Sequence, residues 1–398
     1  MGLIRHIQES MKLKLRISLL MTLVISSVSY AQESKVIIPD IPGYYTLKGD
    51  FHMHTVFSDG HVWPTFRVNE ALRDDLDVIS LTEHIDYEGF PDIIDQDYNK
   101  SYEIASKAAT NKGLIIIKGV EISPRVAPYH HNALFLEDAN ILPTEYMKSG
   151  KAEFVMKDSI THDQLMGPFL AVKKQNAFVS YNHPSWGWWD TKDTVLFTSF
   201  HQELLDAEIL KGVEVVNSGN YNVIAHRMAL EHDLTMLCNT DEHYDNHPRY
   251  KDTHRPMTLV FVRERSAQGV EEALFNKRTA LYFGDYVIAR QPEAEALFKS
   301  SVKVTIERKL RKAEPLLIVN FVNNSDIPFE TKMKAEYDIE GYPMGQVVIP
   351  PHDTTQVILK AIWKYPAKTT IRVTVENILV TPESGLETEF LLFTEEIN

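Results

Sequence analysis

Short apolar runs rich in β-branched residues alternate with helix-type patterns over the first two thirds of the chain, from about Thr46 to Arg290. Eight such runs occur, at residues 47–54, 77–82, 114–122, 133–136, 178–181, 213–216, 235–238 and 259–262. Alternating strands and helices are typical of βα units around parallel strands. A barrel is favoured over an open doubly wound sheet, since no glycine-rich phosphate-binding loop follows the first run. We therefore predict an α/β barrel domain over residues 40–295.

The pattern changes at about Leu297, where helix signals end. Six closely spaced apolar runs follow, at residues 302–306, 316–321, 346–349, 355–359, 370–375 and 389–393. Turn residues such as Asn323-Asn324-Ser325-Asp326 separate them. Closely spaced strands without helices predict an antiparallel β-sandwich. The second predicted domain covers residues 296–398.

The first 31 residues have the features of a secretory signal. Three basic residues between Lys12 and Arg16 precede an apolar run from Ile17 to Val28, and small residues precede the expected cleavage after Ala31. A membrane anchor is disfavoured, because a membrane span needs roughly twenty apolar residues. We expect the mature protein to be periplasmic or secreted, without stable membrane insertion.

Charge and cysteine content exclude two classes of function. With 41 basic and 55 acidic residues the net charge is −14, which repels phosphate polymers, so no nucleic-acid partner is expected. The chain has one cysteine, Cys238, so neither an intramolecular disulfide nor a cysteine-based metal site can form. Any metal must therefore be held by histidines and carboxylates.

Fourteen of the 16 histidines lie between His52 and His254. The first two occur in the segment Asp50-Phe-His52-Met-His54-Thr-Val-Phe-Ser-Asp59-Gly60. Residues two apart in a strand share a face, so His52 and His54 should point to the same side. Asp59 follows in a turn at the carboxyl end of the strand, where barrels collect their active sites.

Further metal-type ligands follow other predicted strands. They are His84, Glu121, the pair His130 and His131, His183, and Asp241 with His243. One buried histidine is usually satisfied by a hydrogen bond and needs no metal. Five strand ends that each deliver such side chains favour a metal site, since crowded carboxylates need cations to offset their repulsion.

These motifs, in this order, resemble the PHP family, the polymerase and histidinol phosphatase domain hydrolases. The matching segments are the His52 to Gly60 motif, Thr82-Glu83-His84, Gly119-Val120-Glu121, Asn182-His183-Pro184 and the closing Asp241-Glu242-His243. The resemblance covers about Lys48 to Arg290 and implies a distorted (β/α)7 barrel. Glu83 stands where the family has Asp, a departure that touches no ligand and is expected to alter only its surroundings.

The resemblance implies nine ligands for two to three divalent ions, Zn, Mn or Fe. The first ion would be held by His52, His54, Glu121 and Asp241. The second would share Glu121 and add His130 and His183. The third would be held by Asp59, His84 and His243. We prefer His130 to His131, because family members place this histidine just before a short apolar run.

The function implied is an exported metal-dependent phosphoesterase, with a phosphodiesterase favoured over a phosphomonoesterase. Signal, barrel and sandwich together resemble a secreted subgroup of PHP phosphodiesterases, the Sb-PDE type. A hydroxide bridging the first two ions would attack the phosphorus of a small-molecule phosphoester. The catalytic candidates are Asp241, His243 and His183, and either Asp241 or His243 would pass a proton to the leaving group.

Two other classes of function remain open at this stage. An amidohydrolase-like C–N hydrolase also begins with H-x-H and ends with a strand-terminal Asp, but would not require Asp59 or His243. A non-catalytic binding protein with a vestigial barrel is disfavoured by the complete ligand set. Among substrate contacts, Trp186, Trp188 and Trp189 either form an apolar wall or pack the barrel rim. The candidate phosphate clamps are Arg125, Arg227, Arg249 and Arg255.

Overall fold

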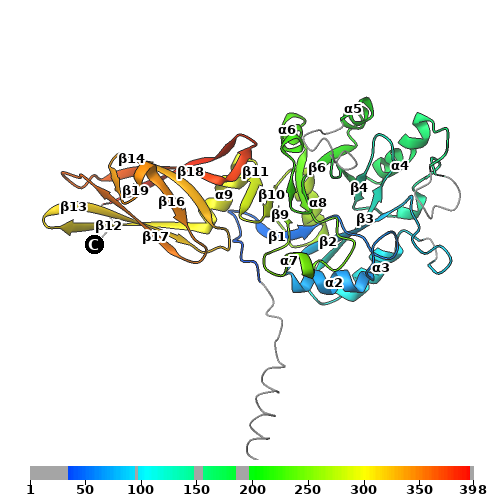
Figure 1. The fold of residues 1–398 in the computed structure, drawn as a ribbon, viewed down its shortest axis with the longest axis horizontal. Coiled ribbons are helices and arrows are strands. Elements are labelled where there is room, and N and C mark those ends of the chain that lie inside the picture. Colours follow the sequence, from blue (N-terminus) through cyan, green and yellow to red (C-terminus); the bar gives the residue numbers. More distant parts are fainter. Residues whose placement is uncertain (1–34, 95–96, 148–155, 185–196, 395–398) are drawn as a thin grey trace, which may run out of the picture. The chain divides into compact units, whose positions relative to one another are not determined.

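The computed structural model describes residues 35–94, 97–147, 156–184 and 197–394, which form an α/β barrel followed by an all-β region (Figure 1). The predicted signal peptide and Trp186, Trp188 and Trp189 lie outside the described residues. Within the described part of the chain, no helix combines the length and apolarity needed to cross a bilayer.

The barrel is built from strands that follow one another closely in the predicted order. They are β1 (Tyr45–Asp50), β2 (Val78–His84), β3 (Ile115–Ile122), β4 (His131–Leu134), β5 (Phe178–Tyr181), β6 (Leu210–Asn217), β8 (Thr235–Asn239) and β9 (Met257–Val262). They pair in the order β9, β1, β2, β3, β4, β5, β6 and β8. Between β8 and β9, Thr258 joins the strands through its side chain: its Oγ1 accepts from Cys238 N and donates to Cys238 O, each at 2.8 Å.

Two of these strands depart from the predicted parallel arrangement. β4 runs antiparallel to β3 and β5, and β9 runs antiparallel to β1. Only residues 123–130 connect β3 to β4. A parallel crossover needs a dozen or more residues, so this connection can only reverse the chain. Three short strands that the sequence analysis missed complete the region: β7 (Asn220–Tyr221), β10 (Thr279–Phe283) and β11 (Tyr286–Ala289).

Helices connect many of the strands, and α2 packs beside α3 (Figure 1). They are α2 (Pro64–Arg73), α3 (Lys100–Ala109), α4 (His162–Lys174), α5 (Ser199–Asp206), α6 (Val223–Glu231), α7 (His247–Tyr250), α8 (Ala267–Phe275) and α9 (Gln291–Ser301), with a 3₁₀ turn η1 (Ala139–Ile141). Local sequence sets their starts. Pro64 opens α2, where its missing N–H costs nothing, and the Asn222 side chain caps α6 by accepting from Ile224 N and Ala225 N.

The C-terminal region is an antiparallel sandwich, as predicted. One layer contains β14 (Phe329–Ala335), β16 (Gln346–Ile349), β18 (Lys368–Thr381) and β19 (Ser384–Phe393). The other contains β12 (Val302–Arg311), β13 (Glu314–Asn323), β15 (Asp338–Glu340) and β17 (Thr354–Lys360), and a 3₁₀ turn, η3 (Pro343–Gly345), precedes β16. β14 was missed because its apolar residues alternate with charged ones; Phe329 and Met333 are buried, whereas Glu330 and Lys334 are exposed.

Barrel and sandwich share both a sheet and a core. β11 pairs in parallel with β18, through Val287 with Ile378 and Ile288 with Leu379. Phe298 on α9 is fully buried, and its ring lies 5.0 Å from that of Phe329. The predicted boundary between residues 295 and 296 stays a prediction, and it falls inside α9.

Phe298→Ala tests how far this shared core stabilises the chain. Truncation of a fully buried Phe removes its packing and leaves a cavity, so we expect the free energy of unfolding to fall by about 3–5 kcal/mol. Denaturant unfolding measures this change. Ile93→Ala, at an exposed position, should change it by less than about 0.5 kcal/mol. A loss below about 1 kcal/mol for Phe298→Ala would mean that α9 does not anchor the core.

Candidate metal centre

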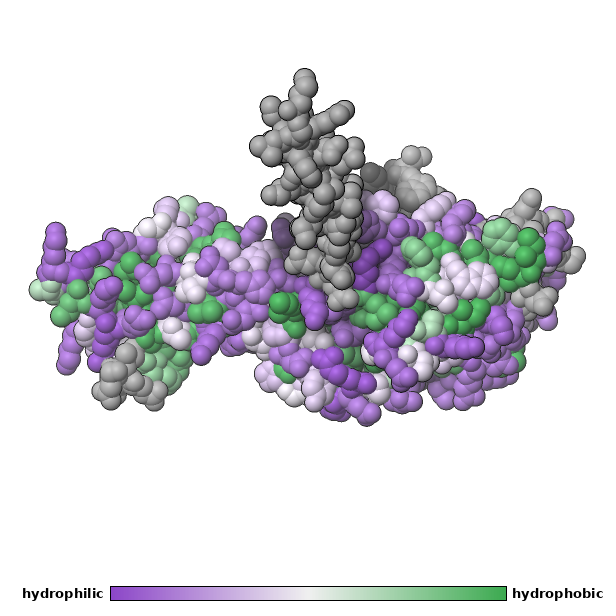
Figure 2. All heavy atoms as spheres, turned by 90° about the horizontal axis from the view of Figure 1, so that it is seen from below, coloured by the Kyte–Doolittle hydropathy of each residue, from purple (hydrophilic) through white to green (hydrophobic). Residues whose placement is uncertain are grey.

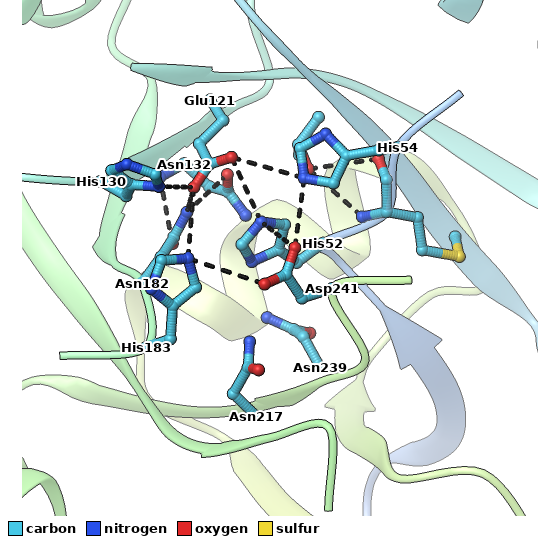
Figure 3. A network of polar contacts seen from close by, with 12 residues as sticks. His52, His54, Glu121, His130, Asn132, Asn182, His183, Asn217, Asn239 and Asp241 are labelled. Atoms are coloured by element: carbon cyan, nitrogen blue, oxygen red, sulfur yellow. Dashed lines mark hydrogen bonds and ion pairs between the residues drawn. The ribbon is translucent and has the colours of Figure 1, made fainter. Parts of the chain in front are cut away.

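His52 and His54 lie on an extension of the first barrel strand. β1 ends as a regular strand at Asp50, but the extended backbone continues and is held from the far side by the segment after β8. Asp241 N donates to His52 O at 2.9 Å, and His54 N donates to Glu242 O at 3.0 Å. Both imidazoles are fully buried and both point their Nε2 atoms at the same two carboxylates (Figure 3).

Glu121, at the end of β3, and Asp241, just beyond β8, are these two carboxylates. Asp241 Oδ1 lies 3.2 Å from Nε2 of both His52 and His54. Glu121 Oε2 lies 3.5 Å from His52 Nε2 and 3.4 Å from His54 Nε2. Its other oxygen, Oε1, lies 3.1 Å from His130 Nδ1 and 3.5 Å from His183 Nε2. Glu121 therefore stands between two pairs of imidazoles, as a shared ligand would (Figure 3).

A second cluster adjoins the first. Asp59 Oδ1 lies 3.1 Å from His243 Nε2, and Asp59 Oδ2 lies 3.5 Å from His84 Nε2. The His54 ring stacks between those of His84 and His243, with centroid distances of 4.6 and 4.4 Å. The structure thus brings all nine predicted ligands together, and it adds the Nδ1 side of His54 to the Asp59 cluster.

The two neighbouring histidines at the start of β4, His130 just before the strand and His131 as its first residue, have different surroundings. His130 faces Glu121, as described above. The ring of His131 stacks on Tyr181 at 5.0 Å and meets Phe169 edge to face at 5.2 Å. Burial, together with the nearby His201, holds the pKa of His131 well below its ordinary value. The structure places His130, and not His131, among the ligand candidates.

The buried donors fit divalent metal ions. Four atoms at the centre make no hydrogen bond among the described residues: His52 Nε2, His54 Nε2, Asp59 Oδ1 and Glu121 Oε2. Buried polar atoms are normally hydrogen-bonded, so such a group marks a place where another partner is needed. A mixture of imidazole nitrogens and carboxylate oxygens is the ligand set that Zn, Mn and Fe accept.

Electrostatics support the same interpretation. Burial opposes protonation of His52, but the carboxylates of Asp241, Glu214 and Glu121 outweigh it and raise the pKa of His52 well above its ordinary value. Burial also opposes ionisation of Glu121, but His84, His52 and His130 together hold its pKa well below the ordinary range. The carboxylates thus stay ionised inside the protein, and they need positive charge nearby.

Glu83 shows what the departure from the family motif does. Its carboxylate accepts from Thr55 N at 3.1 Å, from Thr55 Oγ1 at 2.5 Å and from Ser58 Oγ at 2.6 Å. Burial raises the pKa of Glu83 despite these donors. Glu83 therefore anchors the turn that presents Asp59, without lying among the ligands itself.

Glu214, on β6, is a functional residue that the sequence analysis missed. It is buried, and its Oε1 lies 2.7 Å from His52 Nδ1 and accepts from Asn239 Nδ2 at 2.9 Å. Its Oε2 accepts from His183 N at 2.7 Å and from Asn217 Nδ2 at 2.9 Å. A carboxylate only accepts, so His52 Nδ1 carries a proton, and in the neutral imidazole that binds a metal the lone pair is on Nε2, which faces the centre. The only signal in the sequence that could have indicated Glu214 was the presence of one acidic residue within a predicted strand of mostly apolar residues.

The prediction that Arg255 is a phosphate clamp is wrong. Arg255 is buried, and it pairs with Asp50 and, at 3.2 Å, with Asp74. Arg255 lies just before β9, and Asp50 at the end of β1, Glu70 on α2 and Asp74 directly after α2 surround its guanidinium. Arg227 pairs with Glu383 of the sandwich. Arg249 Nη1 lies 3.5 Å from an oxygen of Glu242, the residue between the ligand candidates Asp241 and His243 in the sequence. Arg125 is exposed and lies three residues after the end of β3 at Ile122.

Comparisons with known proteins identify the families that the two regions of the chain match. Residues 50–250 match the PHP domain family, and residues 302–391 match an Ig-like domain family. A solved two-domain protein from Bacteroides vulgatus, described as containing a predicted PHP-like metal-dependent phosphoesterase, is 35% identical, with a TM-score of 0.76 over 90% of this chain and 98% of its own. A presumed metal-dependent phosphoesterase from Bifidobacterium adolescentis is 17% identical, with a TM-score of 0.39 over 57% of this chain and 95% of its own. No curated protein is significantly similar to the chain.

Glu214→Gln tests whether the network around Glu214 orients the ligands. Loss of a carboxylate that orients a ligating histidine typically lowers metal affinity about 10- to 100-fold, and we expect that loss here. Wild-type protein should bind about two to three equivalents of divalent metal. Competition against a chelator measures the affinity, with the exposed Glu208→Gln as the matched control. Unchanged affinity in Glu214→Gln would show that Glu214 serves the fold alone.

Proposed function

Since the chain belongs to the PHP domain family, we propose that it is a metal-dependent phosphodiesterase that cleaves a P–O ester of a small molecule. The solved relative that is 35% identical is described as containing a PHP-like metal-dependent phosphoesterase. This similarity supports hydrolysis of phosphoric esters as the class of reaction. The choice of diester, the metals and the compartment are our own inferences.

The observation that carries the proposal is the second ligand cluster. Amidohydrolase chemistry needs only the first one or two metal positions, at His52, His54, Glu121 and Asp241. Asp59, His84 and His243 add a further position beside them. A charge centre at that place is suited to hold phosphoryl oxygens, on which negative charge accumulates during phosphoryl transfer.

When bound, divalent ions would supply Lewis acidity and lower the pKa of a coordinated water to near 7. The chain itself determines which atoms face the substrate. His243 Nδ1 lies 2.8 Å from the carbonyl oxygen of Asp241, so it donates a proton there, and His243 Nε2 presents its lone pair to the Asp59 cluster. This tautomer fits His243 as a ligand. Asp241 Oδ2, 3.7 Å from His183 Nε2, is then the better placed of the two candidates to accept a proton.

Exposure indicates where the substrate approaches. The side chains of His52 and His54 are fully buried, whereas 27% of the His243 side chain and 27% of the Asp59 side chain are exposed. A phosphoester therefore meets the Asp59 cluster first. His183, on the other side of Glu121, is 11% exposed.

The sparse arginines favour a diester over a monoester. A monoester carries up to two negative charges and is usually held by bidentate arginines. Of the four arginine candidates, Arg255 and Arg227 pair with acids that are not ligand candidates. A diester carries a single negative charge, so fewer positively charged side chains are needed to bind it. The net charge of −14 also argues against polymeric nucleic acid as the substrate.

Export remains part of the proposal. Residues 1–31 carry the signal pattern, and cleavage there would remove four basic residues and one acidic residue, giving 37 basic and 54 acidic residues and a net charge of −17. The site uses no cysteine, so it does not depend on a reducing compartment. We therefore place the mature enzyme in the periplasm or outside the cell.

His243→Ala tests the assignment to phosphoester chemistry. Loss of one preorganised charge-stabilising contact typically costs about 10²- to 10³-fold in turnover, and we expect that loss for a diester such as bis(p-nitrophenyl) phosphate. Metal at the His52 and His54 position should be retained. The exposed His247→Ala is the matched control and should keep wild-type turnover.

Two outcomes would contradict the proposal. Wild-type protein that cleaves amides or lactones but no phosphoester, with His243→Ala unaffected, would favour the amidohydrolase class. Faster turnover of p-nitrophenyl phosphate than of the diester would make the enzyme a phosphomonoesterase.

N-terminal sequencing of protein expressed with its full leader tests export. Recovery from the periplasm or medium with Gln32 as the first residue is the expected result, since cleavage should follow Ala31. Protein that stays in the cytoplasm and begins at Met1 would refute it.

A further inference from the structure

Three segments that are far apart in sequence meet at one end of the sandwich. They are residues 308–314, where β12 turns into β13, residues 361–368 between β17 and β18, and residues 393–394 at the end of β19. Figure 1 shows β12 and β13 side by side in the sandwich. We call this surface the tip patch, and it consists of Arg308, Lys309, Leu310, Lys312, Trp363, Lys364, Lys368 and Phe393.

Specific contacts fix the segments to one another. Tyr365 Oη donates to Lys309 O at 2.7 Å, and the guanidinium of Arg308 lies over the Tyr365 ring at 5.2 Å. Arg308 Nη2 also donates to Thr394 Oγ1 at 3.2 Å, and Thr394 N donates to Ala367 O at 3.0 Å. The tip patch is therefore a built surface and not three independent loops.

Large apolar side chains project from the tip patch into solvent. Trp363 is 99% exposed, Leu310 66% and Phe393 56%. Leu310 continues the row of β12 that includes Val304 and Ile306, which pack on the core, but it lies beyond the last core residues. Figure 2 shows apolar residues interrupting the hydrophilic surface over the sandwich. Grouped exposed apolar side chains commonly mark a binding surface.

Positive charge surrounds these apolar side chains. Arg308, Lys309, Lys312, Lys364 and Lys368 make no ion pair within the described part of the chain, whereas neighbouring Arg311 is neutralised by Glu340 at 2.8 Å. A hollow open to solvent adjoins Lys368, and its lining includes two further basic residues, Lys334 and Arg372, and one acid, Glu336. Such a concentration of cations is unexpected in a chain whose net charge is −14. The tip patch therefore suits a partner that is both anionic and apolar.

We propose that the tip patch binds the surface of an anionic lipid bilayer. Trp prefers the boundary between headgroups and acyl chains, and each Lys or Arg near an anionic bilayer contributes about 1 kcal/mol. Leu310 and Phe393 would reach the acyl boundary, which an acidic polysaccharide does not offer. The absence of a spanning helix among the described residues agrees with a protein that lies on the bilayer rather than across it. The inference is independent of the proposed reaction.

Vesicle binding tests the proposal. The chain from Gln32 onward is used, because residues 1–31 carry their own apolar run and Val36–Asn398 forms one compact unit. It should float with phosphatidylcholine vesicles containing about 30% phosphatidylglycerol, but not with pure phosphatidylcholine, and added salt should weaken the binding. Lys309→Ser with Lys364→Ser should lower the partition coefficient by roughly 10- to 30-fold, at about 1 kcal/mol for each lysine.

The controls separate this surface from general charge. Lys107→Ser with Lys112→Ser makes the same charge change at exposed barrel positions and should leave binding unchanged. Trp363→Ala should weaken binding, and Trp363→Phe should restore most of it; melting temperatures check that each variant is folded. Three results would overturn the proposal: no binding to anionic vesicles at low salt, equal losses in the two lysine pairs, or binding to an acidic polysaccharide without binding to vesicles.

Discussion

Glu121 is a single buried carboxylate with imidazoles on both of its oxygens, and the rest of the centre is arranged around it. His52, His54 and His84 approach Oε2 within 3.5 Å, while His130 and His183 approach Oε1. Asn182 Nδ2 donates to Oε1 at 2.9 Å and sets its orientation. An ionised group this deeply buried is costly without opposing charge. The barrel therefore brings strand ends from distant parts of the sequence to one carboxylate that only cations can balance.

A second buried charge holds these strand ends in position. Arg67 on α2 is fully buried; its Nε donates to His54 O at 3.0 Å, and its Nη2 donates to Glu242 O and its Nη1 to Tyr244 O, each at 2.7 Å. One guanidinium thus ties the segment of His54 to that of Asp241 and His243. Glu70 balances its charge at 2.8 Å. Removal of one partner of a buried ion pair costs about 3–5 kcal/mol, so this arrangement is rigid in a way that loop contacts alone are not.

The sequence was most informative where metal-type ligands followed segments with the apolar pattern of strands. Strand ends carrying His, Asp or Glu indicated a metal site, because parallel strands deliver their carboxyl ends to one face. The set of nine ligands came from the resemblance to the PHP family, and one of them, His130, lies before the antiparallel strand β4. Glu214 and Arg67 were not found, because a charged residue within a strand or helix does not reveal which distant groups it will contact in the folded chain. The prediction for Arg255 was wrong for the same reason: its acidic partners, Asp50 at the end of β1 and Asp74 directly after α2, are far from it in the sequence. β14 was not predicted as a strand because charged residues on its exposed face interrupt its apolar residues.

Backbone conformation shows a further cost of assembling the centre. Asp241 has a φ of +54° and His183 a φ of +25°, both in the left-handed region that residues other than glycine rarely adopt. Asp tolerates this conformation better than most residues, and Asp241 N is held by His52 O at 2.9 Å. The His183 N–H is likewise held, here by the buried carboxylate of Glu214 at 2.7 Å. Strain of this kind persists only where surrounding contacts over-determine it. Glu214 therefore has two roles, since one oxygen orients the His52 ring and the other holds the strained backbone of His183, and it thereby supports ligand candidates for two neighbouring metal positions.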